Sequence, residues 1–145
     1  MKNIQKVLAN IIQESIKIFW ILFRVILPVV IVIRALELLG AIPYLAKFLE
    51  PLTSFIGIDG SLGLVWMAAI LVNIYAGMAA FASLQPIFDY TVAETTILGL
   101  IILIAHSLPI EVAIARQSRV SAIFNLLFRF INAVIAGKIL NYIFI

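Results

Sequence analysis

The side chains best suited to chemistry lie at two interruptions inside otherwise apolar segments of this 145-residue chain. Where a helix breaks, backbone N–H and C=O groups lose their partners, and the half-helix ends carry partial charges. Amides, carboxylates and freed backbone groups there can hydrogen-bond a sugar hydroxyl or a base edge, and they can equally coordinate a cation. We therefore predict a binding site for a small polar solute. Its residues are Asn73, Tyr75 and Gly77 at the first interruption, and His106, Ser107 and Glu111 at the second.

Several of these side chains also have a purely structural interpretation, which the sequence leaves open. Asn73 could simply hydrogen-bond a neighbouring carbonyl, and His106 could simply cap the half-helix that precedes it. Glu111 lies one turn beyond the second interruption and could pair with Arg116 or Arg129. Tyr75 is as suited to packing as to contact with a solute.

The composition of the chain predicts a membrane protein. Apolar residues make up 65% of the chain and charged residues 12%, whereas soluble domains have about 45–50% and about 25%. Too few charges remain to cover a surface in water. We predict a single membrane domain over residues 1–145, with an all-α, multi-pass fold.

The composition also argues against several functions. The chain has no cysteine, which excludes disulfides, thiolate metal sites and cysteine nucleophiles. A single histidine gives no support to a histidine-built metal site or to a Ser/His/Asp set. The ten Lys and Arg residues form no basic run, so nucleic acid is not an expected partner. We expect no enzyme activity, metal or cofactor, while a coupling ion, Na⁺ or H⁺, stays open.

The N-terminal segment predicts an amphipathic helix over residues 1–17. Apolar side chains at residues 3–17 fall on one helical face, and polar ones, lysines included, fall opposite. Such a helix lies in the membrane interface with its lysines toward the headgroups. Alternatively, this segment is the polar-ended start of the first span.

The first clear span covers residues 18–39. Pro28 should kink it, because proline removes a helix hydrogen bond. Arg34 and Glu37 are three residues apart, so they share a face and can pair. Residues 40–60 are interrupted by proline and glycine, which predicts one or two short helices at the interface.

Residues 61–87 are apolar again and contain the first interruption. They form either one long crossing or a re-entrant hairpin of two half-helices that meet near Asn73–Gly77. A hairpin of this kind is tolerated at membrane depth only where protein buries its tip.

The rest of the chain predicts one broken span and one continuous span. Thr91 and Glu94 fit a capping box that opens a helix over residues 92–106. Ser107 and Pro109 then separate it from a second piece, residues 108–118. The last span covers residues 120–144.

Basic residues favour the hairpin and indicate an orientation. If residues 61–87 re-enter, five basic residues share one side of the membrane and Lys47 alone faces the other. The positive-inside rule then places the N-terminus in the cytoplasm. A full crossing would remove this asymmetry. The five residues are Lys2, Lys6, Lys17, Arg116 and Arg119.

The last span carries a stripe that could contact another helix. Asn125, Arg129 and Asn132 recur at helical spacing, and Ala133 and Gly137 form a pair of small residues that lets helices approach closely. We predict that these five residues form an oligomer interface.

Five short motifs occur in an order that resembles the nucleoside recognition, or Gate, domain family. They are LEPL (Leu49–Leu52), IDG (Ile58–Gly60), VNIYAG (Val72–Gly77), TVAETTIL (Thr91–Leu98) and HSLPIEVA (His106–Ala113). The family includes spore maturation proteins A and B and small paired proteins of the bacterial inner membrane. It is similar to repeats of the ferrous iron transporter B and of concentrative nucleoside transporters.

The resemblance covers about residues 15–140 and implies a bacterial inner-membrane protein that acts on nucleoside-like solutes. Complete transporters of this type carry two inverted repeats with the site between them, and this chain holds one. We therefore expect half of a transporter, paired with itself as a homodimer or with a second gate-type protein. The alternative is a membrane scaffold or assembly partner that transports nothing.

Overall fold

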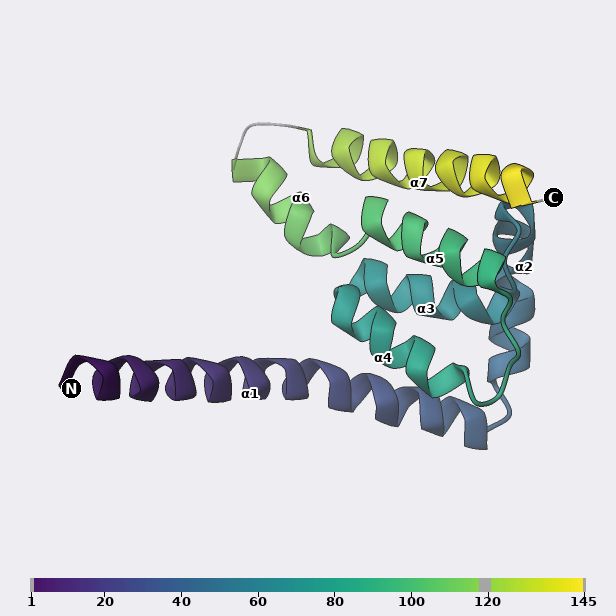
Figure 1. Cartoon of the computed structure of the whole chain (residues 1–145). Helices are drawn as coiled ribbons and strands as arrows, with labels where there is room; N and C mark the ends of the chain where they lie inside the picture. Colours follow the sequence, from purple (N-terminus) through teal and green to yellow (C-terminus); the bar gives the residue numbers. More distant parts are fainter. Residues whose placement is uncertain (1, 118–120, 145) are drawn as a thin grey trace.

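The computed structural model describes residues 2–117 and 121–144, and the described residues form seven helices and no strand (Figure 1). Arg119, one of the five basic residues counted above, lies outside the described residues. The helices are α1 (Lys2–Leu38), α2 (Ile42–Ile56), α3 (Gly60–Leu71), α4 (Ile74–Leu84), α5 (Val92–Ile104), α6 (Leu108–Gln117) and α7 (Ala122–Phe144).

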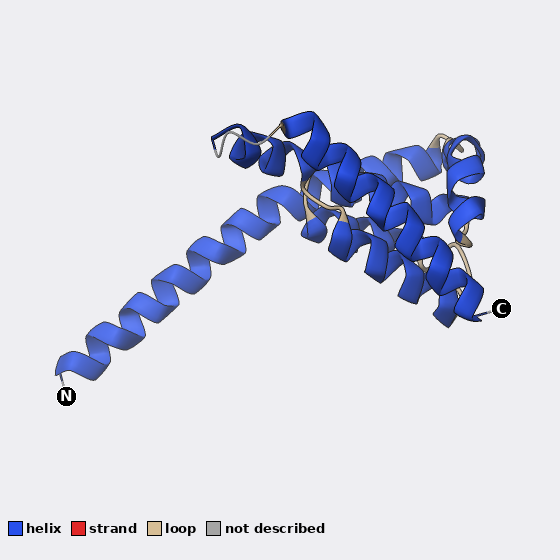
Figure 2. Cartoon of the chain, turned by 90° about the horizontal axis from the view of Figure 1, so that it is seen from above, coloured by secondary structure: helices blue, strands red, loops and turns tan. Residues whose placement is uncertain are grey.

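Four of the described helices run in a similar direction in the view of Figure 1, whereas α1 diverges from α7 in Figure 2. In Figure 1, α3, α4, α5 and α7 run side by side, while α2 crosses their shared end. The axes of α2 and α3 differ by 92°. The N-terminus and the C-terminus lie at opposite ends of this direction. The end of α6, which carries Arg116, points toward the same side as the N-terminal half of α1, and α2, which carries Lys47, lies at the other side.

The predicted interfacial helix and first span form one helix, α1, which differs from the predicted boundary at residue 17. No glycine or proline occurs between residues 3 and 27, so nothing in the sequence ends a helix there. Pro28 lies inside α1, which continues past it to Leu38. The C-terminal half of α1 packs against α4 and buries Ile33. Its N-terminal half leaves the bundle, as the view from above shows (Figure 2).

Residues 61–87 form a helical hairpin and not a single crossing. α3 runs away from α2, the chain turns at Val72 and Asn73, and α4 runs back beside it. The two helices approach closely because Gly77 faces Ala69; a Cβ atom on Gly77 would lie 2.8 Å from the Cβ of Ala69. The side chain of Trp66 fixes α3 in place. It donates a hydrogen bond to the carbonyl of Ala105 and stacks on the ring of Phe130.

The predicted broken span is present as α5 and α6. Its start has the predicted capping box: Thr91 N donates to the Glu94 carboxylate over 2.9 Å, and Glu94 N donates to the Thr91 hydroxyl over 3.2 Å. α5 ends at Ile104, two residues before the predicted end, and α6 begins at Leu108, as predicted, and ends at Gln117, one residue before the predicted end. The core lies where α2, α3, α5 and α7 converge. Its largest fully buried side chains include Trp66, Ile56, Leu62, Ile97 and Ile101.

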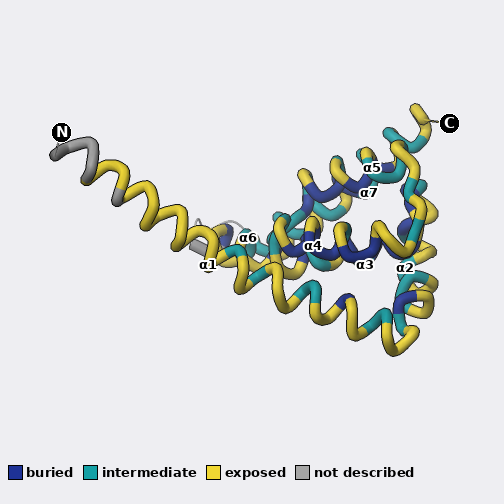
Figure 3. Tube along the Cα trace, turned by 60° about the horizontal axis from the view of Figure 1, so that its bottom comes forward, coloured by how far each residue is buried: buried dark blue, intermediate teal, exposed yellow. Residues whose placement is uncertain are grey.

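Three segments are long and apolar enough to cross a membrane: Lys6–Leu38, Val92–Ala115 and Ala122–Phe144. The last two have 24 and 23 residues, which corresponds to about 35 Å of helix and exceeds the ~30 Å hydrocarbon core. Large apolar side chains are exposed along the outside of the bundle, while buried residues concentrate on α3, α4 and α5 (Figure 3). This surface is suited to lipid.

Candidate functional site

The two interruptions predicted from the sequence meet in the structure. Ser107 N, in the break between α5 and α6, donates a 2.8 Å hydrogen bond to the carbonyl of Ala69, near the end of α3. The indole Nε1 of Trp66 donates to the carbonyl of Ala105 over 3.1 Å. Both bonds satisfy carbonyls that lack a partner in their own helix. The hairpin tip and the broken span therefore form one junction, some 30 residues apart in sequence.

At the hairpin tip, Asn73 acts as the N-cap of α4. Its backbone is extended, with φ −172°, and its side-chain oxygen accepts a 3.0 Å hydrogen bond from Ala76 N. Its carbonyl accepts from Gly77 N. Asn73 thus has a hydrogen-bond partner within the chain, which is a backbone N–H and not the carbonyl considered from the sequence. Gly77 is buried against α3, and Tyr75 is 47% exposed.

At the second break, His106 and Ser107 hold the ends of the two half-helices. Nδ1 of His106 is 2.9 Å from the carbonyl of Ile102, so the ring caps α5, as the structural interpretation predicted. Ser107 has φ +52°, a left-handed conformation that is uncommon outside glycine. Its carbonyl accepts hydrogen bonds from Ile110 N and Glu111 N and so begins α6.

Glu111 forms an ion pair with Arg129 of α7. The two side chains are 19% and 27% exposed. Oε2 of Glu111 is buried and faces Nη1 of Arg129. Arg129 Nε also donates to the carbonyl of Ile104 over 2.7 Å. One guanidinium thus joins the end of α5, the start of α6 and the middle of α7.

The charges at the junction balance. Two half-helix N-termini, those of α4 and α6, contribute partial positive charge, and two C-termini, those of α3 and α5, contribute partial negative charge. Glu111 and Arg129 cancel each other. The formal charges of these two side chains therefore sum to zero.

One side of the junction is not covered by the chain. Leu71, Val72, Tyr75 and Ile110 are between 42% and 58% exposed. The backbone N–H groups of Ile74 and Tyr75, at the start of α4, have no hydrogen-bond acceptor among the residues that the structure describes. These donors are available to a group outside the chain.

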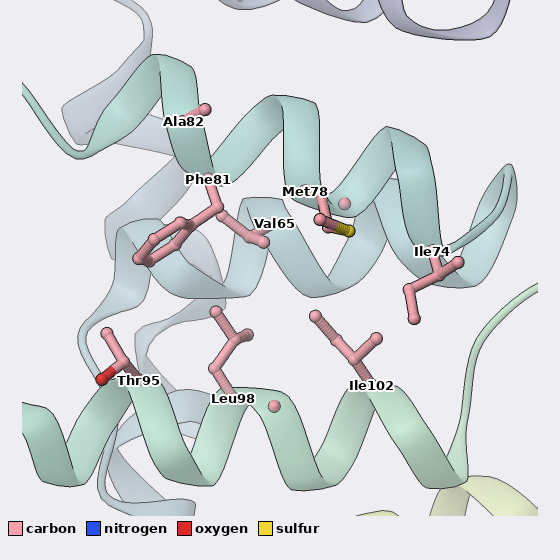
Figure 4. A pocket seen from close by; sticks show the side chains of 10 residues that line it. Val65, Ile74, Met78, Phe81, Ala82, Thr95, Leu98 and Ile102 are labelled. Carbon is pink, nitrogen blue, oxygen red and sulfur yellow. The ribbon is translucent and has the colours of Figure 1, made fainter. Parts of the chain in front are cut away.

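An apolar groove lies beside the hairpin tip, between α4 and α5, with Val65 of α3 at its base (Figure 4). Its volume is about 420 Å³. Gly77 lines it, but the other five predicted site residues do not. The remaining lining is Ile74, Met78, Phe81, Ala82, Thr95, Leu98, Gly99 and Ile102.

Part of the stripe on α7 packs against helices of the same chain. Ala133 and Gly137 are buried, and a Cβ atom on Gly137 would lie 3.0 Å from Ile101 of α5 and 3.4 Å from Ile56 of α2. Arg129 is held by Glu111. The small residues therefore allow close approach, as predicted, but the neighbouring helices belong to the same chain.

The two asparagines of the stripe complete this picture. Asn132 Nδ2 donates to the carbonyl of Phe128 in its own helix over 2.6 Å, and Asn125 is partly exposed near the start of α7.

A second polar network, which the sequence did not reveal, fixes the outer ends of α3 and α5. Asp59 caps α3 and accepts from Ser61, whose hydroxyl is 2.8 Å from the hydroxyl of Tyr90. Asp59 N donates to the carboxylate of Glu94 over 3.1 Å. Burial raises the pKa of Tyr90 above its ordinary value, the hydrogen bond with Ser61 opposes this, and the charges of Asp59 and Glu94 add to it. The network ties the hairpin to the broken span at the end opposite the junction.

These features define an all-helical membrane protein with a helical hairpin and a broken helix. The chain matches no protein-family model and no solved structure. It is similar to the uncharacterized membrane protein YvoD of Bacillus subtilis (strain 168), with 28% identity over 98 residues. The match covers 68% of this chain and 30% of YvoD. The comparison supports a membrane location and identifies no family, so the resemblance to the Gate family stays an expectation.

Proposed function

We propose that the chain is half of a transporter that binds a small, neutral, polar solute and moves it across the membrane as part of a dimer. The hydrogen bond between Ser107 N and the Ala69 carbonyl carries the proposal, because it joins a hairpin tip to a helix break. Broken helices that meet within the membrane are how many transporters build a polar site.

The open side of the junction supports a second half. Free N–H groups at Ile74 and Tyr75 would be costly in lipid, so another protein or a solute must satisfy them. A second copy or a gate-type partner would enclose the junction, with a bacterial inner membrane as the setting and the N-terminus in the cytoplasm. The resemblance to the Gate family makes a nucleoside the first candidate solute, and Na⁺ or H⁺ the candidate coupling ion.

The structure changes the roles that we assign to the six predicted residues. Asn73, His106 and Glu111 hold the breaks in shape and act as positioning residues. Tyr75 and the free backbone donors beside it are the groups that we assign to the solute. Ser107 and Gly77 set the backbone geometry of the two breaks.

A scaffold without transport is the second candidate, and one observation favours it. The polar side chains of Asn73, His106 and Glu111 all find partners within the chain. Residues that only hold helices together would show the same contacts.

Ligand-induced stabilisation separates the two candidates. A solute present at about 100 times its Kd should raise the free energy of unfolding by about 2.7 kcal/mol. We expect such a thermal shift with at least one nucleoside or base, and we expect Tyr75→Ala to abolish it while changing the unliganded Tm little. Tyr142→Ala, at an 81% exposed tyrosine near the end of α7, is the matched control. No shift across a broad panel would favour the scaffold.

A further inference from the structure

A polar hollow lies in the corner between α2 and α3, and none of the six predicted site residues lines it. Its volume is about 310 Å³, at the lower end of the ~300–1,000 Å³ of ligand pockets. Its polar lining consists of Lys47, Glu50 and Ser54 on α2, and Asp59 in the loop that leads to α3. One cation, two carboxylates and one hydroxyl therefore surround the same space.

The charges on α2 at this hollow are not paired with one another. Lys47 and Glu50 are three residues apart on one helix, the same spacing as two acid–base pairs on α1. Those pairs, Glu14–Lys17 and Arg34–Glu37, are ion pairs. Among the residues that the structure describes, neither Lys47 nor Glu50 has such a partner. The hollow thus keeps both signs of charge available to a molecule outside the chain.

The other two polar side chains of the hollow are also available. Asp59 accepts through Oδ1 from the backbone N–H and the hydroxyl of Ser61, which leaves Oδ2 free of hydrogen bonds from the described residues. Ser54 is exposed, so its hydroxyl can rotate toward a bound group. An ammonium group has three N–H donors. The carboxylates of Glu50 and Asp59 and the hydroxyl of Ser54 offer one acceptor for each.

A neighbouring face of α2 is suited to lipid. Tyr44, Phe48 and Phe55 are 79%, 80% and 53% exposed, and their spacings of 4 and 7 residues place them on one side of the helix. The axes of α2 and α3 differ by 92°, and α2 crosses the end of the bundle (Figure 1). With α5 and α7 across a membrane, α2 would lie along the boundary of the bilayer, where tyrosine is favoured. This arrangement brings the hollow to the level of the lipid headgroups.

We propose that the hollow binds the headgroup of phosphatidylethanolamine, which carries a phosphate and a primary ammonium. Lys47 would meet the phosphate, while Glu50 and Asp59 would accept from the ammonium. The two charges of the headgroup are thus complementary to those of the hollow. The acyl chains would lie beside the aromatic face of α2. This site is separate from the junction and does not depend on solute transport.

A comparison of two lipids tests the proposal in the unchanged protein. Phosphatidylcholine has the same phosphate, but its quaternary nitrogen carries no N–H and cannot donate to a carboxylate. Native mass spectrometry of the protein in detergent measures the binding of each lipid. We expect phosphatidylethanolamine to bind about two- to fivefold more tightly, the range of an exposed charge contact. Equal binding of the two lipids would overturn the proposal.

Two variants separate the two contacts of the headgroup. Lys47→Gln should weaken the binding of both lipids by up to about fivefold, because both carry the phosphate. Glu50→Gln should weaken the binding of phosphatidylethanolamine alone, by a similar factor. The matched controls are Lys17→Gln and Glu14→Gln, at an exposed pair on α1, and they should change neither affinity. Equal effects of the control variants and the hollow variants would contradict a specific site.

The free headgroup distinguishes a lipid from a soluble ligand. Phosphoethanolamine carries the same two charges as the lipid but has no acyl chains. We expect it to displace phosphatidylethanolamine only weakly, because the aromatic face of α2 adds contacts to the lipid alone. Displacement at equal concentration would make the hollow a site for a soluble zwitterion and would overturn its assignment to a lipid.

Discussion

Arg129 stands out among single residues because it joins three helices, α5, α6 and α7, at the junction. It pairs with Glu111, and its Nε donates to the Ile104 carbonyl at the end of α5. Both charges are mostly buried, so each needs the other to offset the cost of leaving water. Helical spacing in the sequence predicted that Arg129 belongs to a polar stripe. It did not predict which neighbouring helix this stripe contacts, because spacing alone does not identify a partner.

Removing the guanidinium should therefore destabilise the fold. We expect Arg129→Gln to lower the free energy of unfolding by about 3 kcal/mol, since it leaves a buried carboxylate without its cation. Adding Glu111→Gln should recover part of the loss. Unfolding in detergent micelles, followed by circular dichroism, measures both.

The exposed pair Arg34–Glu37 on α1 supplies the matched control. Its side chains are 55% and 33% exposed, so Arg34→Gln should cost less than about 1 kcal/mol. Equal losses from Arg34→Gln and Arg129→Gln would contradict a special role for the junction pair.

At the scale of elements, the hairpin depends on close contact between α3 and α4. Gly77 faces Ala69 and Val65, so the two helices can approach to backbone distance. The alternation of apolar stretch, polar interruption and apolar stretch predicted the hairpin, and the positive-inside rule favoured it over a full crossing. The partner of each break could not be predicted, because a freed carbonyl accepts from any donor that the fold brings near.

Two glycines beside the same groove allow this packing to be tested. For Gly77→Ala we expect a loss of about 1–3 kcal/mol, because the new methyl group would lie 2.8 Å from Ala69 Cβ. Gly99 has no atom within 4 Å of a built Cβ, so Gly99→Ala should stabilise α5 by about 0.5–1 kcal/mol. The denaturation midpoints of the two variants, compared with that of the unchanged protein, measure both effects. The same sign for both would show that steric contact at Gly77 is not limiting.

For the whole molecule, the arrangement gives the chain two distinct ends. The N-terminal half of α1 and the end of α6 point to one side, while α2 and the C-terminus lie at the other (Figure 1). The orientation predicted from basic residues requires this arrangement, because it places Lys47 on the side opposite the N-terminal lysines and Arg116. If it holds in a membrane, the two ends face opposite compartments.

Labelling of single cysteines should detect this orientation. In intact cells, a membrane-impermeant maleimide should react with Lys47→Cys, on α2, and should reach Asn10→Cys, near the start of α1, only after the cells are opened. Both positions are exposed. Reaction at Asn10→Cys in intact cells would contradict a cytoplasmic N-terminus, and reaction at both would indicate two orientations, as an antiparallel homodimer requires.

The sequence alone determined the class of the protein, because composition fixes the solvent that a surface tolerates. It also located the helices, the hairpin, the capping box and both breaks, since Pro, Asn, Ser and Thr act on the backbone next to them. Only the tertiary structure decided what those polar groups bind. Asn73, His106 and Glu111 are used within the chain, Arg129, Ala133 and Gly137 face its own helices, and α1 runs unbroken through residue 17. The physical reason is that backbone breaks are local, whereas hydrogen-bond and charge partners depend on which distant helices come together.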